Sequence, residues 1–233
     1  MCQRRADTPS LNRRSPIADA SALDDDHSDF LRLVRNDPML GRASRELRGL
    51  RPVRVPTVAQ ALLRAFCGQL IEAKVARQLE RTIIRKLCVA GPDRLHVSPT
   101  TRDLGQIAPM QLRALGLHTR RAAALVRLCR SLELERLHEQ PTEAIARRLE
   151  RERGLGPWSV GVVCLEGLGR VDYGLVGDLG LIKLLRALRG RPVEGWETAE
   201  LLEPYGAWAG LASMYLLAGF GRGLLPVSEA RAA

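Results

Sequence analysis

The chain has 233 residues, 45% of them hydrophobic, which is enough to bury one sizeable core or two small lobes that share a cleft. Lys and Arg number 36 against 26 Asp and Glu, and the formal net charge of +10 favours a polyanionic partner, nucleic acid before a membrane surface. No apolar run has membrane-spanning length, and the five cysteines are too widely spaced for zinc or iron–sulfur ligation. The start of the chain is rich in Arg and lacks the apolar region of a secretory signal, so we expect a cytoplasmic protein.

The N-terminal part of the chain differs in composition from the rest. Residues 1–35 mix Ser, Pro, Arg and Asp with few large apolar side chains to offset the entropy of ordering, which predicts a mobile tail. We expect a folded unit over residues 36–227 and a short C-terminal tail over 228–233. Arginine supplies nearly all of the positive charge, which suits bidentate phosphate contacts and is equally explained by codon composition.

Apolar residues recur every three or four positions along most of the chain, which predicts an all-α fold. The first long helix should begin at Thr57, which is a suitable cap, and run to about Gly68. No strand pattern competes, apart from an ambiguous stretch at residues 171–173. Further helices are expected over residues 71–87, 109–116, 119–132, 143–152, 157–165, 179–190 and 207–217.

A Gly-x-Gly turn separates two of these helices. In Gly154-Leu155-Gly156 the missing Cβ atoms permit a tight turn and close backbone approach, and Pro157 suits the first position of the next helix. The free backbone N–H groups and the helix dipole can hold a DNA phosphate without reading bases. Taken alone, the same pattern is more typical of a plain tight turn.

A carboxylate follows this turn at a fixed distance. Asp178 lies twenty residues after Trp158 and directly before an amphipathic helix. Asp is a favoured N-cap, so a structural role is the simpler interpretation of Asp178 alone. The two interpretations are compatible, because a carboxylate that accepts amide hydrogen bonds stays ionised, and an oxocarbenium-like transition state requires a permanent anion.

The stretch from Gly154 to Leu185 resembles the helix-hairpin-helix (HhH-GPD) DNA glycosylase superfamily, in particular its branch of type II 3-methyladenine DNA glycosylases. That branch has a tryptophan two positions after the hairpin glycine and its catalytic aspartate twenty residues later, as Trp158 and Asp178 are placed here. The resemblance implies two helical lobes that flank a DNA- and base-binding cleft. It covers about residues 38–226, and its most specific part is 154–185.

The resemblance also implies the other parts of a site. Gln69 and Leu70 match the pair that enters the duplex where the nucleotide is expelled, and Trp208 matches a second pocket tryptophan. The hairpin of Gly154, Leu155, Gly156 and Pro157 would bind the DNA phosphate. Relatives bind an alkali ion on hairpin carbonyls, which would fall near Glu150, Glu152 and Leu155, although no side chain here indicates a metal.

The implied activity is that of a monofunctional glycosylase acting on double-stranded DNA, without a cofactor and as a monomer. Lysine-bearing relatives, which also cut the backbone, place their lysine where this chain has Trp158. The substrate would be an alkylated purine of the 3-methyladenine or 7-methylguanine type, whose positive charge already weakens the glycosidic bond. Asp178 would stabilise the sugar cation, and Trp158 and Trp208 would stack on the flipped base.

Several alternatives stay open. Asp172 is a rival carboxylate in the same loop, and Tyr173, Trp196 and Tyr205 could each belong to the pocket wall or to the core. The chain departs from the family pattern at Glu152-Arg153, before the hairpin, and at Val162, where an aromatic residue can stand. A glycosylase for a deaminated or oxidised base, or a non-catalytic DNA-binding module, are the competing functions.

Overall fold

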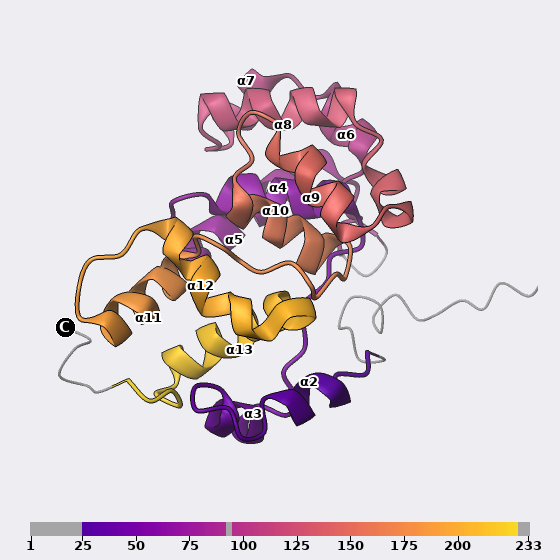
Figure 1. Ribbon diagram of the computed structural model, residues 1–233. Coiled ribbons are helices and arrows are strands. Elements are labelled where there is room, and N and C mark those ends of the chain that lie inside the picture. Colours follow the sequence, from indigo (N-terminus) through magenta and orange to yellow (C-terminus); the bar gives the residue numbers. More distant parts are fainter. Residues whose placement is uncertain (1–24, 92–94, 228–233) are drawn as a thin grey trace, which may run out of the picture.

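The protein is described by a computed structural model over residues 25–91 and 95–227 (Figure 1). In these ranges the regular structure is helical, apart from an isolated antiparallel bridge between Ala90 and His96, which confirms the expected all-α class. No helix in the same ranges has the length and apolarity to cross a membrane. The α-helices are α2 (Ser28–Leu33), α3 (Gly41–Glu46), α4 (Val58–Gly68), α5 (Ala73–Leu87), α6 (Thr101–Gln106), α7 (Pro109–Ala114), α8 (Thr119–Ser131), α9 (Thr142–Glu150), α10 (Pro157–Val162), α11 (Leu179–Arg189), α12 (Thr198–Leu202) and α13 (Ala209–Gly221).

Shorter helical turns join some of these elements. A π-helical turn, η2 (Val163–Gly167), continues α10 directly. Three 3₁₀ turns are η1 (Leu134–Glu139), η3 (Gly195–Glu197) and η4 (Glu203–Trp208). Single π turns within helices are rare and are often found at functional sites, and η2 lies next to the cavity described below.

The folded region begins earlier than residue 36. The aromatic ring of Phe30 in α2 and the side chain of Val34 after it are both fully buried, so the expected boundary falls inside the core. The apolar residues at 30, 31 and 34 were too few for helical spacing to be convincing, but each finds a partner in the C-terminal helices. Residues 1–24 of the N-terminal tail predicted over 1–35, and the C-terminal tail predicted over 228–233, lie outside the described residues.

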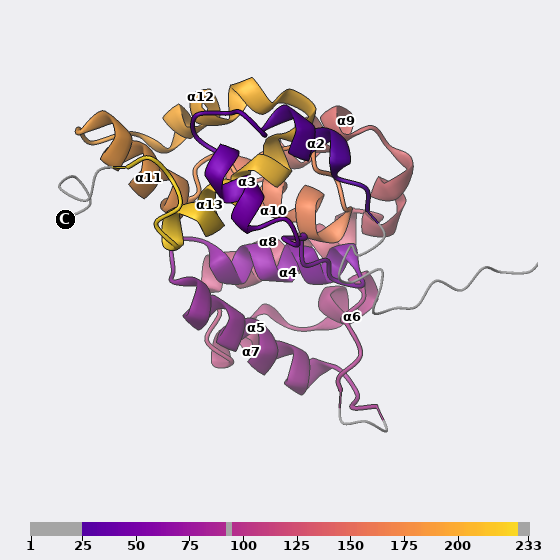
Figure 2. The ribbon, with the colours of Figure 1, turned by 90° about the horizontal axis from the view of Figure 1, so that it is seen from below.

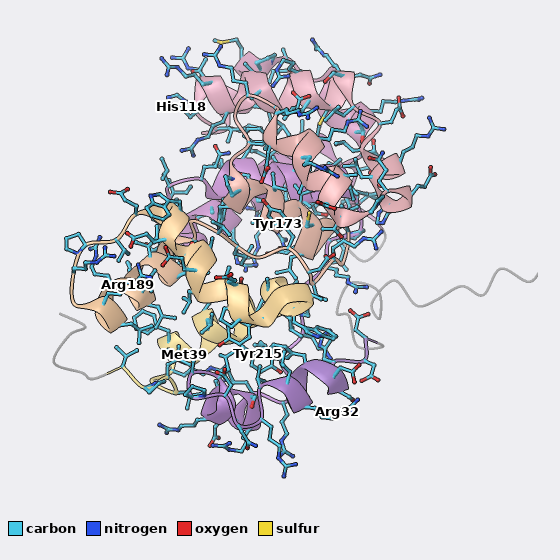
Figure 3. All side chains as sticks on the ribbon, viewed as in Figure 1. Arg32, Met39, His118, Tyr173, Arg189 and Tyr215 are labelled. Carbon is cyan, nitrogen blue, oxygen red and sulfur yellow. The ribbon has the colours of Figure 1, made fainter. Side chains whose placement is uncertain are left out.

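Two hydrophobic clusters form the core. The first is formed by the successive helices from α4 through α10 and includes Leu63, Ile83 and Leu125. The second joins α2 and α3 to α11, α12 and α13 and includes Phe30 and Tyr215, and Figure 3 shows Tyr215 between α13 and α3. Figure 2 shows α4 between α5 on one side and the α2, α3 and α13 group on the other. Helices α4 and α10 contribute to both clusters and therefore fix one cluster against the other.

Helix α4 begins where the sequence predicts. The Thr57 hydroxyl accepts a hydrogen bond from the Gln60 backbone N–H at 3.1 Å, as expected of an N-cap. Nine residues of α4 are buried, because the helix is covered on both sides by the two clusters. Its last turn, at Gly68, ends at the mouth of the cavity.

Two of the turns between helices have the same order of residues: a glycine with positive φ, a buried leucine and an N-cap. Gly116 and Gly154 have φ values of +107° and +102°, which favour glycine strongly. A buried leucine follows each of them, Leu117 at 1% exposure and Leu155 at 7%. The residue after each leucine is the N-cap of the next helix, α8 or α10. The chain thus uses the same turn twice, although its sequence shows no repeat.

Candidate active site

The turn between α9 and α10 positions the first part of the site. A side chain at Gly154 would contact Ala124 Cβ at 3.3 Å and the Phe66 ring at 3.5 Å, so both the positive φ and the packing require glycine here. Gly156 is the N-cap residue of α10, and Pro157 occupies the first helical turn. Leu155 anchors the turn in the first cluster, and Gly156 and Pro157 stay exposed.

The end of α4 is bonded to this turn. The Gln69 side-chain amide donates to the Gly154 carbonyl at 2.8 Å and to the Ser159 hydroxyl at 3.1 Å. The next residue, Leu70, has a φ of +55° and is 82% exposed. Among the described non-glycine residues it alone has a positive φ, a conformation that costs of order 1–2 kcal/mol for a side chain with a Cβ. A strained, protruding leucine beside a cavity indicates a function rather than packing.

Asp178 is held through both carboxylate oxygens. Oδ1 accepts the Gly180 N–H at 2.7 Å and the Leu181 N–H at 3.4 Å, which makes Asp178 the N-cap of α11. Oδ2 accepts the indole N–H of Trp158 at 2.8 Å. The capping role and a carboxylate that lines the cavity therefore occur together, as the sequence allowed.

Buried hydroxyl groups hold the loop that carries Asp178. The Thr198 hydroxyl accepts the Gly177 N–H at 2.8 Å and donates to the Gly195 carbonyl at 2.7 Å. The Ser213 hydroxyl accepts the Leu175 N–H at 3.0 Å. Thr198 and Ser213 are both fully buried. Sequence reasoning missed these two residues, although isolated hydroxyls in apolar helices were a usable signal.

A cavity of about 1160 Å³ opens where these parts meet, between α4, α5, α10 and α11. Its volume is ample for a nucleobase, since small-molecule sites span roughly 300–1,000 Å³. Trp196 in η3 also faces this cavity and is 67% exposed. The structure thus brings most of the predicted site residues to one place, namely Asp178, Trp158, Gln69, Leu70, Gly154, Gly156 and Pro157.

Comparisons with known proteins agree with this geometry. The chain is similar to a DNA-3-methyladenine glycosylase of Bacillus subtilis, with 24% identity over 205 residues, covering 83% of this chain and 67% of that protein. The solved structure of a 3-methyladenine DNA glycosylase from Archaeoglobus fulgidus gives a TM-score of 0.72 at 22% identity, over 84% of this chain and 70% of that one. No protein-family model matches the chain.

A further solved structure is an 8-oxoguanine glycosylase/lyase of Clostridium acetobutylicum in complex with double-stranded DNA that contains cytosine opposite 8-oxoguanine. Its TM-score is 0.77 at 17% identity, over 89% of this chain and 74% of that one. At such identities the solved structures establish the fold, and the hairpin, the aspartate and the curated sequence relative agree with it. The chain has the fold of the helix-hairpin-helix DNA glycosylases and is similar to one of them in sequence.

One residue expected from the superfamily pattern lies elsewhere. Trp208 does not line the cavity; its ring is 6.0 Å from that of Phe30 and 6.4 Å from that of His27, between centroids. The structure therefore contradicts the expectation that Trp208 faces a base together with Trp158. Helix α2 covers Trp208, and the exposed Trp196 faces the cavity instead.

The rival carboxylate Asp172 is separate from this glycosylase-type site. Asp172 is exposed and accepts the Thr142 hydroxyl at 3.0 Å. It lines a second cavity of about 320 Å³, together with Tyr173, whose hydroxyl donates to Glu150. Of the undecided aromatic residues, Tyr205 belongs to the core.

A side chain of α8, Arg127, binds the hairpin. The Arg127 guanidinium donates to the Glu152 carboxylate at 2.8 Å and to the Arg153 carbonyl at 3.0 Å. In the described part of the chain no group of His, Cys, Asp and Glu side chains could hold a metal ion. The Glu152 carbonyl, near which the resemblance would place an alkali ion, accepts the Leu155 N–H at 3.0 Å, so the turn closes with a bond between its own residues.

A polar cluster that the sequence did not predict lines the inner part of the cavity. Arg64 donates to both Glu80 oxygens, at 2.9 and 3.1 Å, and also to Glu166. The Gln60 side chain donates to Glu80 at 3.1 Å. Burial acts to lower the pKa of Arg64, but hydrogen bonds and charges from Glu80 and Glu166 raise that pKa on balance, so the guanidinium stays charged.

Proposed function

We propose that this protein is a monofunctional DNA glycosylase that hydrolyses the N-glycosidic bond of alkylated purines, such as 3-methyladenine and 7-methylguanine, in double-stranded DNA. The observation that supports this most directly is the Asp178 carboxylate, hydrogen-bonded to Trp158 at the edge of the cavity. The DNA-3-methyladenine glycosylase of Bacillus subtilis, similar over most of the chain, supports the choice of substrate.

DNA binding would begin at the hairpin. Its exposed residues Gly156 and Pro157 are the N-cap and the first residue of α10, where backbone N–H groups attract a phosphate. Gln69 bonds the end of α4 to this hairpin, so Leu70 projects at a fixed position relative to the bound strand. Leu70 would then fill the gap in the base stack that an expelled nucleotide leaves. Enzymes that act on a base in a duplex must extrude it in this way.

The chemistry would rest on Asp178. An alkylated purine carries positive charge and leaves as a neutral base, so the reaction needs no strong general acid. The Asp178 carboxylate would stabilise the oxocarbenium-like sugar and orient the attacking water. No amine stands at the position of Trp158, which supports base release without cleavage of the DNA backbone.

The aromatic walls would hold the base. Trp158 lies beside Asp178, and Trp196 faces the same cavity from η3. Stacking and cation–π attraction of an electron-poor purine to an indole are worth about 1–2 kcal/mol when water is excluded. Trp196 thus takes the role that the sequence assigned to Trp208.

The test is base release from methylated duplex DNA. We expect the protein to release free 3-methyladenine and 7-methylguanine, detected by chromatography, and to leave an intact backbone with an abasic site. Asp178→Asn should slow release by about 100-fold or more, while it still binds a duplex that contains a stable abasic analogue. The amide oxygen of Asn can still accept the Gly180 N–H and cap α11.

Asp172→Asn is the matched control, because it removes one carboxylate from the same loop but outside the main cavity. It should keep most of the activity. Full activity of Asp178→Asn, or loss of activity in Asp172→Asn alone, would contradict the assignment. Binding of DNA with no release of any base would identify a non-catalytic binding module, and equal release of hypoxanthine would favour a broader glycosylase.

A further inference from the structure

The cavity extends along a groove between α4 and α10. On one side a side chain at Gly68 would contact the Trp158 ring at 2.6 Å, and four residues earlier Arg64 forms an ion pair with Glu166. Trp158, Val162 and Glu166 follow each other at intervals of four residues and all line the cavity. Val162 has a small side chain midway along the groove, so the way from Trp158 to Glu166 is not closed by an aromatic ring.

Helix α5 forms the third side of this groove. Its cavity-lining residues Ala73, Ala76, Arg77 and Glu80 recur at helical spacing. The two alanines are small, so the groove reaches the carboxylate of Glu80, which is 4% exposed. The groove therefore has the charged side chains of Arg64, Glu80 and Glu166 at one end, with Trp158 and Val162 along its wall.

The charges at this end do not balance. One guanidinium, that of Arg64, bonds two carboxylates. The exposed Arg77 also lines the cavity, but among the described residues no cation other than Arg64 lies within ion-pair distance of Glu80 or Glu166. Glu80 accepts two hydrogen bonds from Arg64 and one from Gln60, so its charge is largely compensated. Within the described ranges, the Glu166 side chain is seen to accept only from Arg64, and it remains 23% exposed toward the cavity. The excess negative charge therefore belongs to Glu166.

From this arrangement we infer that Glu166 is a specificity-determining residue that favours a positively charged purine over a neutral base in the cavity. This inference rests on the proposed glycosylase function and adds a selection by charge to it. A base alkylated at N3 or N7 is cationic, and its attraction to a partly buried carboxylate is much stronger than it would be in water. A neutral base gains nothing comparable and leaves the carboxylate poorly solvated.

The charge of the base also determines which kinetic constant should change. The positive charge of the base disappears as the glycosidic bond breaks, so Glu166 stabilises the bound substrate at least as much as the transition state. Removing its charge should weaken the capture of methylated DNA without slowing bond cleavage. Asp178, which faces the developing sugar cation, should show the opposite pattern.

The experiment compares binding in an Asp178→Asn background, where substrates are held without turnover. Dissociation constants are measured for two duplexes that differ in one nucleotide, 7-methylguanine, which is cationic, or hypoxanthine, which is neutral. We expect Glu166→Gln to lower the preference for the cationic duplex about tenfold. An unchanged preference would overturn the inference, whereas failure of the wild-type protein to release any base would overturn the proposed function instead.

Two further variants complete the test. Glu200→Gln removes the same charge from an exposed pair with Arg189 outside the cavity and should leave the preference unchanged. Ala76→Leu keeps every charge but fills the groove in front of Glu80 and should lower the preference as Glu166→Gln does. If Glu166→Gln does not fold, Ala76→Leu tests the inference in its place.

A kinetic measurement tests the same role with Asp178 intact. In single-turnover assays, Glu166→Gln should raise the half-saturating enzyme concentration and keep the maximal rate. A fall in the maximal rate alone would contradict the charge-selection role.

Discussion

The indole N–H of Trp158 donates a hydrogen bond to Oδ2 of Asp178 across 2.8 Å. The other carboxylate oxygen is held by the Gly180 N–H at the start of α11. Trp158 belongs to α10 and Asp178 caps α11, and the bond fixes the carboxylate relative to the wall on which a base would stack. The spacing of twenty residues that is visible in the sequence therefore separates the donor and the acceptor of one hydrogen bond.

Trp158→Phe should slow base release by about tenfold or more, because a hydrogen bond to a charged group contributes about 1.5–3 kcal/mol and Phe cannot donate it. An aromatic face for stacking remains, so binding of lesion DNA should weaken less than turnover does. Single-turnover rates and dissociation constants measure the two effects. Trp208→Phe, which changes a tryptophan outside the cavity, should behave as wild type; equal losses in both variants would contradict the role of the hydrogen bond.

Gly68→Ala should also reduce turnover, by moving the same indole. The added methyl group would lie 2.6 Å from the Trp158 ring, so the ring must shift away and its bond to Asp178 must lengthen. Alanine near the end of a helix is favourable by up to about 1 kcal/mol, so the melting temperature should not fall. Gly49→Ala is the control, because no atom lies within 4 Å of its added methyl group. Normal release by Gly68→Ala would show that the indole position is unimportant.

Leu70→Gly should separate stability from function. Glycine adopts the positive φ of residue 70 without strain, and the exposed leucine side chain buries little surface, so the free energy of unfolding should stay the same or rise by up to ~1 kcal/mol. Base release should fall strongly because no side chain remains to fill the stack. Leu70→Ala keeps the backbone strain and should lose activity without any gain in stability. Activity retained in both variants would exclude the wedge.

The sequence predicted the long helices well, for a clear reason. Helices α4, α5, α8 and α11 have both an apolar stripe and an identifiable end, such as the Thr57 cap or Gly190, which takes the left-handed conformation after α11. Helix α6 and η1 were not predicted, because six residues are too few for a periodic pattern. The Thr100–Asp103 capping box was a usable signal for α6.

The sequence did not predict which of two tryptophans, Trp208 or Trp196, lines the cavity. Trp208 and Trp196 both lie in the C-terminal part of the chain, and the superfamily pattern favoured Trp208 for the pocket. Its actual position depends on α2, whose Phe30 packs against the Trp208 ring. Because residues 1–35 were expected to form a tail, nothing in the sequence indicated this contact. The ion pair of Arg64 with Glu166, 102 positions apart, depends on tertiary packing in the same way.

Glu197 is the anchor of the segment that carries Trp196. Its carboxylate is 5% exposed and accepts hydrogen bonds from Arg191 at 2.6 Å, from the Glu194 N–H at 2.7 Å, and from Arg189, which Figure 3 labels at the end of α11. The hydrogen bond from Arg191, followed by that from the Glu194 backbone, lowers the pKa of Glu197 from 4.5 to about 2. The neighbouring residue 198 holds the loop of Asp178.

This lowered pKa predicts a defined pH dependence. A carboxyl group whose pKa is lower in the folded than in the unfolded state stabilises the fold fully above its unfolded value, here 4.5, and loses that contribution as the pH falls toward 2. Glu197→Gln should therefore lower the melting temperature by a constant amount between pH 7 and about pH 5, and the difference from wild type should shrink below pH 4.5. Thermal denaturation at several pH values measures this, with the more exposed Glu200→Gln as a control of small effect. A difference that stays the same down to pH 3 would show that the charge of Glu197 does not hold the Trp196 segment, and the position of that tryptophan at the cavity would then need another cause.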